Sequence, residues 1–483
     1  MDPETDARHH DLLIDGRRVP PASGEYSTDI DPANEQPIAR VARGNAADVD
    51  AAVRAARAAL PVWNGMRAAE RGRILAHFAE LLRANQQEIA ELESLDGGKP
   101  IAAVERQDLP AAIDTLAYYA GWCDKINGHV VPVRPDALTY TIREPLGVVA
   151  AIVPWNFPLM IGMWKIAPAL ACGCTLIVKP AEITPLSMLR LGELALEAGV
   201  PPGVFNVVTG KGSVVGDALV AHPGVDKVTF TGSPSVGRGI LQGAAGNFKR
   251  VTLELGGKSA NVIFADANLD NAVRAAAAGV FFNTGQVCSA GSRILAQRAI
   301  YDAVVERVVA RAQSIKVGDP RQREINMGPL ISAAQMKTVL GYIDTGKQEG
   351  ASLATGGTRL GERGFFVEPT VFANVAHEMR ISQEEIFGPV ASVIPFDDEA
   401  DAIRIANGTA YSLAAGVWSA DIGRVHRVAH ALKAGTVWIN TYGYTDVRLP
   451  WGGSGDSGFG REHGDVAIEN FTEPKAVWLA IDH

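Results

Sequence analysis

The fold class is decided by the segment VVAAIVPWNFPLMIGMWKIAPALACGCTLIV, residues 148–178. Its β-branched and apolar residues predict a strand over 148–153, a helix over 159–171 and a second strand over 175–178. A strand, a crossover helix and a second strand form the repeating unit of a parallel sheet. The segment therefore predicts an α/β protein.

The same alternation continues beyond this segment and is organised in two series. The remaining predicted elements are strands at 204–208, 228–230, 251–253, 261–264 and 294–296, and helices at 186–198, 269–282 and 301–313, with two more helices beginning near Ser213 and Ser235. Residues 48–95 are rich in Ala, Leu and Arg and predict further helices, whereas residues 128–143 predict strands that leave the helical layer. Two α/β units are therefore expected.

Composition excludes several classes of protein. The chain has 483 residues, of which 47% are hydrophobic and 20% charged, so it folds, with two or three domains expected. A net charge of −9 without a long basic run argues against nucleic acid and anionic membranes as partners. The four cysteines are too few for a disulfide framework, and residues 1–16 are acidic and polar without a secretion signal, which predicts a cytoplasmic protein.

One apolar stretch resembles a membrane span but does not fit one. From Leu146 to Val178 the only charged residue is Lys165. Three prolines and Asn156 would break a lipid-exposed helix and leave polar groups unpaired, so we expect strand, turn and buried helix instead.

Other short patterns are better explained by structure than by ligands. Gly453–Gly458 has the spacing G-x-G-x-x-G but follows Pro450 and Trp451 rather than a strand, which favours a glycine-rich loop over a nucleotide fingerprint. The pairs Cys172/Cys174 and His426/His430 lack further ligands at suitable spacing. We expect buried thiols, surface histidines and no metal site.

Three residues carry a possible chemistry. Cys288 lies in the glycine-flanked loop FNTGQVCSAG after a helix, where a thiol can be reached as a nucleophile; the alternative is a structural thiol. Glu254 directly follows a predicted strand, where a carboxylate can act as a general base; the alternative is a glutamate that caps a helix or forms an ion pair. Asn156, between two prolines after another strand, is suited to donate a hydrogen bond to an oxyanion, or is an ordinary turn residue.

Together these segments resemble the aldehyde dehydrogenase superfamily, in its NAD(P)-dependent, hydrolytic branch. The resemblance rests on six motifs in order along the chain, Pro154–Pro158, Lys179–Glu182, Phe230–Ser233 with Gly237, Glu254–Lys258, Gly285–Cys288 and Glu384–Pro389. It implies a Rossmann-like cofactor domain (1–126 and 146–253), a second α/β catalytic domain (254–456) and a small β oligomerisation element (127–145 and 470–483). A homodimer or homotetramer is the implied assembly.

The resemblance also implies a mechanism. Cys288 would attack the aldehyde carbon, Asn156 and the Cys288 N–H would hold the oxyanion, and Glu254 would activate the water that hydrolyses the thioester. NAD is the implied cofactor, because a carboxylate at Glu182 accepts ribose hydroxyls and repels the 2′-phosphate of NADP. The implied cofactor contacts are Pro154, Trp155, Lys179, Glu182, Gly232, Ser233, Gly237, Leu255, Gln335, Glu385 and Phe387. Lys165 lies either near the cofactor or in a structural role.

The substrate is an aldehyde whose identity stays open. The implied tunnel is lined by Phe157, Met160, Ile161, Trp164, Phe282, Tyr442, Tyr444 and Trp451, which favours a hydrophobic or aromatic aldehyde. The same rings could instead form a cage for betaine aldehyde or an amino-aldehyde. A CoA-acylating semialdehyde dehydrogenase and a silent, crystallin-like protein are further alternatives. Trp451 and Gly455 replace the Phe and Lys of many relatives, so the geometry of the family's substrate entrance is not carried over to this chain.

Overall fold

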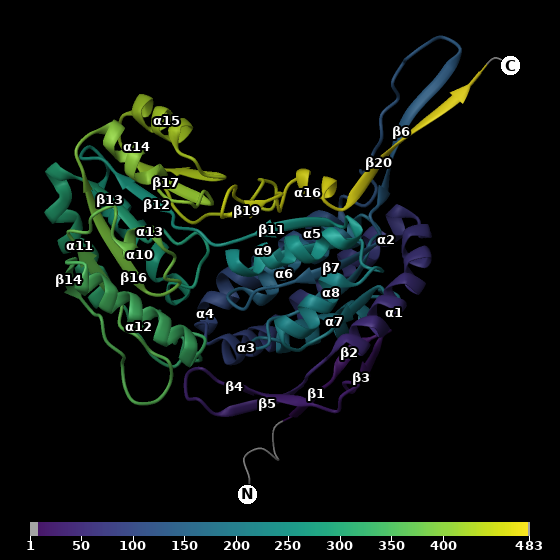
Figure 1. Ribbon diagram of the computed structural model, residues 1–483, viewed down its shortest axis with the longest axis horizontal. Helices are drawn as coiled ribbons and strands as arrows, with labels where there is room; N and C mark the ends of the chain where they lie inside the picture. Colours follow the sequence, from purple (N-terminus) through teal and green to yellow (C-terminus); the bar gives the residue numbers. More distant parts are fainter. Residues whose placement is uncertain (1–7, 482–483) are drawn as a thin grey trace, which may run out of the picture.

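The computed structural model describes residues 8–481, so the first seven residues of the acidic N-terminal stretch and the last two of the expected oligomerisation element lie outside it. Strands in the described part of the chain form four sheets of eight, seven, three and two strands, and helices cover the two large sheets (Figure 1). The predicted α/β class is confirmed.

The eight-stranded sheet has the order β19-β11-β10-β7-β8-β9-β2-β3, and its five central strands are parallel. Those five are β7 (Val148–Ile152), β8 (Thr175–Lys179), β9 (Phe205–Val207), β10 (Lys227–Thr231) and β11 (Arg250–Glu254). The antiparallel edges are β2 (Leu12–Ile14), β3 (Arg17–Val19) and β19 (Gly458–Phe459). From β7 the chain runs outward to β8 and β9 and then returns to β10 on the other side, which is the topological switch point of a doubly wound sheet.

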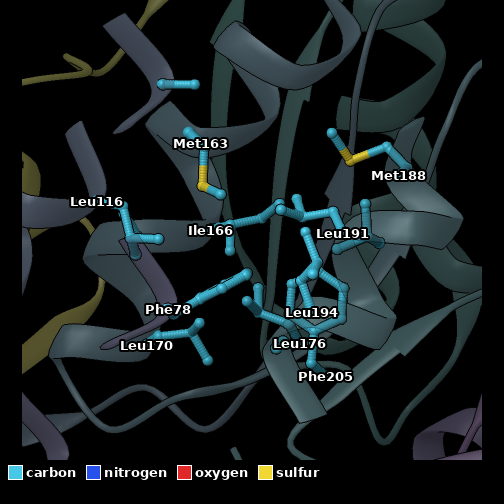
Figure 2. Close-up of a cluster of buried hydrophobic side chains, with 14 of the residues drawn as sticks. Phe78, Leu116, Met163, Ile166, Leu170, Leu176, Met188, Leu191, Leu194 and Phe205 are labelled. Carbon is cyan, nitrogen blue, oxygen red and sulfur yellow. The ribbon is translucent and has the colours of Figure 1, made fainter. Parts of the chain in front are cut away.

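Alternation along β7 explains why both faces of this sheet are covered. Val149 and Ala151 pack in one buried cluster, whereas Val148, Ala150 and Ile152 pack in another. Figure 2 shows the first cluster, where Leu176 and Phe205 of the sheet meet Met163, Ile166 and Leu191 of the covering helices. The helices of this half are α1 (Ala46–Gly65), α2 (Ala68–Ala84), α3 (Gln86–Gly97), α4 (Ile101–Ala103), α5 (Leu109–Ala120), α6 (Pro158–Ala171), α7 (Leu186–Glu197), α8 (Asp217–Ala221) and α9 (Pro234–Ala244).

Short turns interrupt these helices. π-Helical turns span Val104–Asp108 and Gly212–Gly216, and a 3₁₀ turn spans Ala245–Asn247. The helix expected near Ser213 therefore begins as a π-turn and becomes α-helical only at Asp217.

The seven-stranded sheet has the order β14-β15-β16-β13-β12-β17-β18, parallel except for the edge strand β14. Its strands are β12 (Ala260–Ile263), β13 (Arg293–Gln297), β14 (Ser352–Thr355), β15 (Thr370–Ala373), β16 (Val390–Phe396), β17 (Ala414–Trp418) and β18 (Thr436–Ile439). Its helices are α10 (Leu269–Phe281), α11 (Tyr301–Gln313), α12 (Ala333–Gln348), α13 (Arg380–Gln383), α14 (Glu399–Asn407) and α15 (Ile422–Ala431), with 3₁₀ turns at Phe282–Gly285 and Arg298–Ile300.

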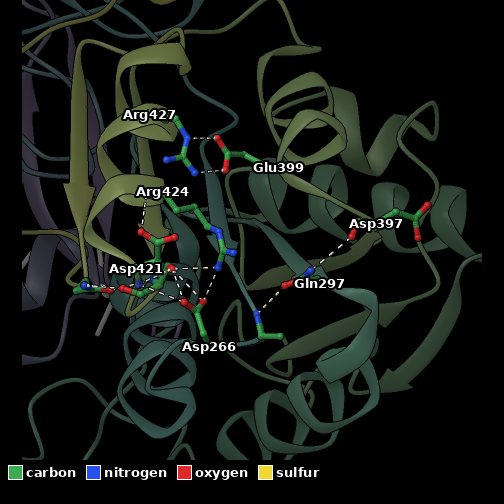
Figure 3. Close-up of polar contacts among 10 residues, drawn as sticks. Asp266, Gln297, Asp397, Glu399, Asp421, Arg424 and Arg427 are labelled. Carbon is green, nitrogen blue, oxygen red and sulfur yellow. Dashed lines mark hydrogen bonds and ion pairs between the residues drawn. The ribbon is translucent and has the colours of Figure 1, made fainter.

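Polar contacts fix two of these helices at the rim of the sheet. Arg427 of α15 binds Glu399 of α14 with two hydrogen bonds, and Arg424 donates to Asp266, which follows β12, at 2.9 Å (Figure 3). Paired arginine–carboxylate bonds of this kind hold a defined geometry.

The remaining strands form two small sheets. β1 (Arg8–His10), β4 (Tyr26–Ile30) and β5 (Pro37–Ala42) form one. β6 (Ala137–Pro145) and β20 (Thr472–Ala480) pair antiparallel into an arm that projects from the rest of the protein, with α16 (Val466–Glu469) just before it (Figure 1). The strands expected within 128–143 thus begin with a single bridge, Val130 to Tyr140, and become continuous from Ala137.

Candidate active site

The first group of expected site residues lies along one edge of the eight-stranded sheet. Asn156 follows β7, Lys179 ends β8, Gly232 follows β10 and Glu254 ends β11. Because these strands are parallel and adjacent, their carboxyl ends meet at the same edge, where doubly wound sheets bind ligands. The Gly232 N–H donates to the Glu254 carbonyl at 3.1 Å, which joins two of these ends directly.

A strained turn carries Cys288 to this edge. Asn283, Thr284 and Gly285 have φ angles of 48°, 57° and 72°, so three successive residues are left-handed after α10. Left-handed backbone is costly for a β-branched residue such as Thr284 and persists only where contacts hold it. The Asn283 side chain supplies such a contact, because its amide donates to the Asn156 carbonyl at 3.0 Å.

The expected oxyanion donor is tied to the same turn. Nδ2 of Asn156 donates to the Gln286 carbonyl at 2.9 Å, two residues before Cys288. A side-chain amide has two N–H donors, so this bond orients the amide while the second N–H can serve a ligand. Asn156, Asn283 and Gln286 therefore connect β7 to the cysteine loop.

Cys288 and Glu254 lie side by side in the interior. They are 8% and 2% exposed, and each shifts the pKa of the other, so the thiol and the carboxylate lie near one another. Burial raises the pKa of the Cys288 thiol well above its usual range, and the Glu254 charge raises it further. The loop expected to expose this thiol instead buries it, so Cys288 is a neutral thiol at neutral pH and needs a nearby proton acceptor.

Glu254 has an environment suited to proton transfer. Burial raises the pKa of its carboxyl to about 8, against the opposing charge of Lys165. Glu462 raises this pKa as well, whereas hydrogen bonding by Trp451 and Cys288 lowers it. A carboxyl that titrates near neutrality is typical of a general acid or base.

Lys165, whose role the sequence left open, forms a buried ion pair. Its side chain is 0% exposed, and Nζ lies 2.6 Å from Oε1 of Glu462. His463 follows and stacks edge-on against Trp164 at 4.5 Å, and burial lowers its pKa to about 4. Sequence reasoning missed Glu462 and His463. A lone lysine in an apolar helix was the available signal, because a buried lysine requires a partner.

The expected ribose and phosphate contacts lie at the ends of β8 and β10. Lys179 is buried, its Nζ donates to the Pro180 carbonyl at 2.9 Å, and burial lowers its pKa to about 8 against the pull of nearby Glu182. Ser233 is exposed at the start of α9 and caps it by accepting from the Val236 N–H. Within the helix, Gly237 allows the close approach of Leu255, since a Cβ there would lie 2.9 Å from its side chain.

The second group of expected cofactor contacts comes from the loop after α13. Oε1 of Glu385 accepts from the Gly257 N–H at 3.0 Å, and burial raises the pKa of Glu385 to about 7. Phe387 packs edge-on against Trp155, which follows β7 together with Pro154, at 5.1 Å. Nε2 of Gln335 donates to the Phe387 carbonyl at 2.8 Å, so Gln335 supports this loop.

These residues suit a dinucleotide. Helix α9 begins shortly after β10, and the positive end of its dipole favours an anion such as a pyrophosphate. Gly256 is required beside Glu385, because a Cβ there would lie 2.0 Å from its carboxylate, so the Glu254–Lys258 segment fits against the loop that carries Glu385 and Phe387. Both groups of contacts thus approach the sheet edge that also holds Cys288.

Apolar side chains surround Cys288. Phe157, Ile161, Trp164, Tyr442 and Trp451 share one buried cluster with it, with Met160 and Phe282 packed at its margin. The expected tunnel residue Tyr444 lies outside this cluster and is 75% exposed, so its place in the tunnel stays a prediction. Trp438, which the sequence did not single out, takes an inner position 4.6 Å from Tyr442.

Across residues 8–481, three or more His, Cys, Asp or Glu side chains are nowhere grouped so that they could hold a metal ion. Within the same range no helix has the length and apolarity needed to cross a membrane.

Comparisons with known proteins agree on one family. A model of the aldehyde dehydrogenase family matches residues 19–477. An aldehyde dehydrogenase of Aspergillus niger is 48% identical over 468 residues, which cover 96% of this chain and 94% of the fungal protein. The NAD⁺ complex of an aldehyde dehydrogenase from Bacillus cereus has a TM-score of 0.97 and 46% identity, covering 100% of this chain and 99% of that one.

A second solved structure is equally similar in shape. A mutant of the P. syringae indole-3-acetaldehyde dehydrogenase AldA, in complex with NAD⁺ and IAA, has a TM-score of 0.97 and 43% identity, covering 99% of this chain and 98% of that one. A match over nearly the whole chain, in sequence and in fold, shows that this protein belongs to the aldehyde dehydrogenase family.

Proposed function

We propose that this protein oxidises an aldehyde to its carboxylic acid with NAD, using Cys288 as nucleophile. The observation that carries the proposal is a buried site in which Cys288 and Glu254 lie close enough to shift each other's pKa and Asn156 is bonded into the cysteine loop. A nucleophile, a proton acceptor and an oxyanion donor in one place are the parts that acyl chemistry requires.

The first step uses all three residues. As the Cys288 sulfur bonds to the aldehyde carbon, its proton passes to the Glu254 carboxylate, and the carbonyl oxygen becomes an oxyanion. The Asn156 amide and the Cys288 N–H stabilise this oxyanion in a site that excludes water, where such bonds are strongest. The product is a thiohemiacetal on Cys288.

The cofactor contacts are Pro154, Trp155, Lys179, Glu182, Gly232, Ser233, Gly237, Leu255, Glu385 and Phe387, with Gln335 as support for the Phe387 loop. When bound, NAD supplies the hydride acceptor that converts the thiohemiacetal into a thioester. The proton held by Glu254 then leaves to solvent. Ionised Glu254 takes a proton from water as the water oxygen attacks the thioester carbon. The C–S bond then breaks and releases the acid, and Glu254 passes its proton to the leaving sulfur, which returns the Cys288 thiol.

Cofactor choice follows from Glu182. Its carboxylate lies close enough to Lys179 to influence its pKa, at the edge that receives the adenosine ribose in the proposed binding mode. A carboxylate there accepts ribose hydroxyls and repels a 2′-phosphate, so NAD is preferred over NADP.

The substrate is a hydrophobic or aromatic aldehyde. Support comes from the aromatic side chains buried around Cys288 and from the indole-3-acetaldehyde dehydrogenase named above. The same rings favour a quaternary ammonium aldehyde by cation–π attraction, so betaine aldehyde is the competing substrate.

A panel of aldehydes tests this function by NADH absorbance. We expect phenylacetaldehyde and indole-3-acetaldehyde to show higher kcat/KM than acetaldehyde and betaine aldehyde, and Cys288→Ala to abolish turnover while NAD still quenches tryptophan fluorescence. Preference for betaine aldehyde would overturn the substrate class. Thioester formation on addition of coenzyme A would overturn hydrolysis, and silence of the folded, NAD-binding protein across the panel would favour a non-catalytic role.

We further propose that the arm of β6 and β20 joins subunits into a dimer or tetramer. Its side chains Val133, Leu138, Trp478, Leu479 and Ile481 are exposed and apolar, and such surfaces are commonly covered by another chain. The four described cysteines are all unpaired and buried, which is consistent with the proposed cytoplasmic location.

A further inference from the structure

The glycine-rich loop after Trp451 is not used by the mechanism above. Trp451 and Glu462 exchange two backbone hydrogen bonds of 2.8 Å, so residues 452–461 form a closed loop between them. Within the loop, β19 pairs antiparallel with β11, and Gly458 lies opposite Glu254. Gly458 has φ of +100°, and a Cβ on it would lie 2.1 Å from the Leu253 carbonyl oxygen, so only glycine allows this approach.

The closure of this loop also places two side chains beside Glu254. Nε1 of Trp451 donates to Oε1 of Glu254 at 3.4 Å. On the other side of the bridge, the Glu462 carboxylate holds Lys165, whose charge acts on Glu254. The loop therefore contacts the backbone of Glu254 through Gly458, and Trp451, which directly precedes the loop, contacts the Glu254 carboxylate.

We propose that Trp451 is a positioning residue for Glu254, and that the loop 452–461 exists to bring its indole N–H to the carboxylate. The proposal rests on the proposed role of Glu254 in hydrolysis. It gives Trp451 a function beyond its place in the buried apolar cluster that contains Cys288, because phenylalanine would fill the same space but could not donate a hydrogen bond.

Loss of this hydrogen bond should raise the pKa of Glu254. A donor to a carboxylate favours its ionised form, so the indole N–H lowers the pKa of Glu254, and its loss raises that pKa. The other charged or titratable groups around Glu254 are Lys165 from α6, Glu462 and His463 from the segment after the loop, and Cys288 from the cysteine loop. A Trp451→Phe variant leaves all of these in place.

The experiment compares Trp451→Phe with the unaltered enzyme across pH 6 to 10. In the unaltered enzyme kcat rises with pH to half its maximum near 8 if thioester hydrolysis limits turnover. In the variant this midpoint moves upward by roughly 0.5 pH unit, with about threefold lower kcat at pH 7, the size expected for one long hydrogen bond to a carboxylate. The initial burst of NADH slows in the same direction at low pH, because the ionised carboxylate also accepts the thiol proton in the proposed first step.

A matched control removes an indole N–H from the same cluster. Nε1 of Trp438 donates to the Tyr444 carbonyl at 2.9 Å, and its ring lies 6.2 Å from that of Trp451. Trp438→Phe should leave the pH midpoint unchanged. A shift of equal size in both variants would overturn the proposal, because it would show a general packing effect.

A double-mutant comparison separates this proposal from the function on which it rests. Glu254→Gln should slow both the NADH burst and the steady state, because the carboxylate serves both steps, and adding Trp451→Phe to it should cause no further loss, because the effect of Trp451 passes through the carboxylate. If Glu254→Gln turns over normally, the assignment of Glu254 fails. If Glu254→Gln is slow but Trp451→Phe leaves the pH midpoint in place, only the role of Trp451 fails.

Discussion

Replacing Glu254 by glutamine should stabilise the protein, although it removes the proposed general base. The carboxyl has a pKa of about 8 when folded against 4.5 as its ordinary value, because it is buried. The folded state therefore holds a proton that the unfolded chain has already released, and stability is lost as the pH rises from about 4.5 to about 8. Glutamine has no charge to bury, so Glu254→Gln removes this loss.

The magnitude follows from the shift in pKa. Each unit is worth about 1.4 kcal/mol, so the stabilisation should be roughly 1 kcal/mol at pH 5.5, about 3 kcal/mol at pH 7 and about 5 kcal/mol above pH 8. Urea denaturation followed by tryptophan fluorescence, without cofactor and at several pH values, measures the difference in free energy of unfolding between the two proteins.

The control is Glu306→Gln, which removes the same charge from an exposed position on α11. It should change stability by less than about 0.5 kcal/mol at each pH. The reasoning is refuted if Glu254→Gln is no more stable than the unaltered protein at pH 8, or if the difference between them stays constant with pH. Either result would mean that interactions of the charged carboxylate offset its burial.

Three further predictions concern the oxyanion, the cofactor and the arm. Asn156→Ala should lower kcat by about 10²- to 10³-fold, the usual cost of one oxyanion donor, with NAD binding by fluorescence retained; an unchanged kcat would contradict the role of its amide. Glu182→Gln should raise kcat/KM with NADP relative to NAD by about tenfold, because it removes one repulsive charge pair, and an unchanged ratio would place the 2′-phosphate elsewhere. Trp478→Glu should reduce the molecular mass seen by sedimentation, whereas Ile422→Glu, at an equally exposed apolar position on α15, should not.

The sequence predicted the elements between residues 148 and 313 closely, because local signals determine them. The helix expected over 301–313 matches α11, and the strands expected at 148–153 and 175–178 match β7 and β8 to within a residue. Period-2 alternation and helix-ending glycines need no tertiary information. The α/β class followed from the same signals.

The details of the site depend on contacts between segments that are far apart in the chain. The sequence therefore predicted them less well than it predicted the helices and strands. The Lys165–Glu462 pair joins residues 297 positions apart, and nothing near Glu462 in the chain indicates its partner. The burial of Cys288 depends on aromatic residues from α6 and from the segment around Trp451, although its own loop has the composition of an exposed turn. The exposure of Tyr444 could not be predicted either, since an aromatic residue in a loop gives no sign of the direction it faces.

The arm has a consequence for biosynthesis. Its two strands are far apart in the chain: the carboxylate of Glu144 in β6 forms an ion pair with Lys475 in β20, 331 positions later. While a ribosome translates the intervening residues, β6 lacks its β20 neighbour and presents open hydrogen-bonding groups along that edge, where the same segment of another nascent chain can pair. The proposed joining surface is thus completed late in translation, and a truncated product that ends before residue 472 would retain the strands of both large sheets but would lack one strand of the arm.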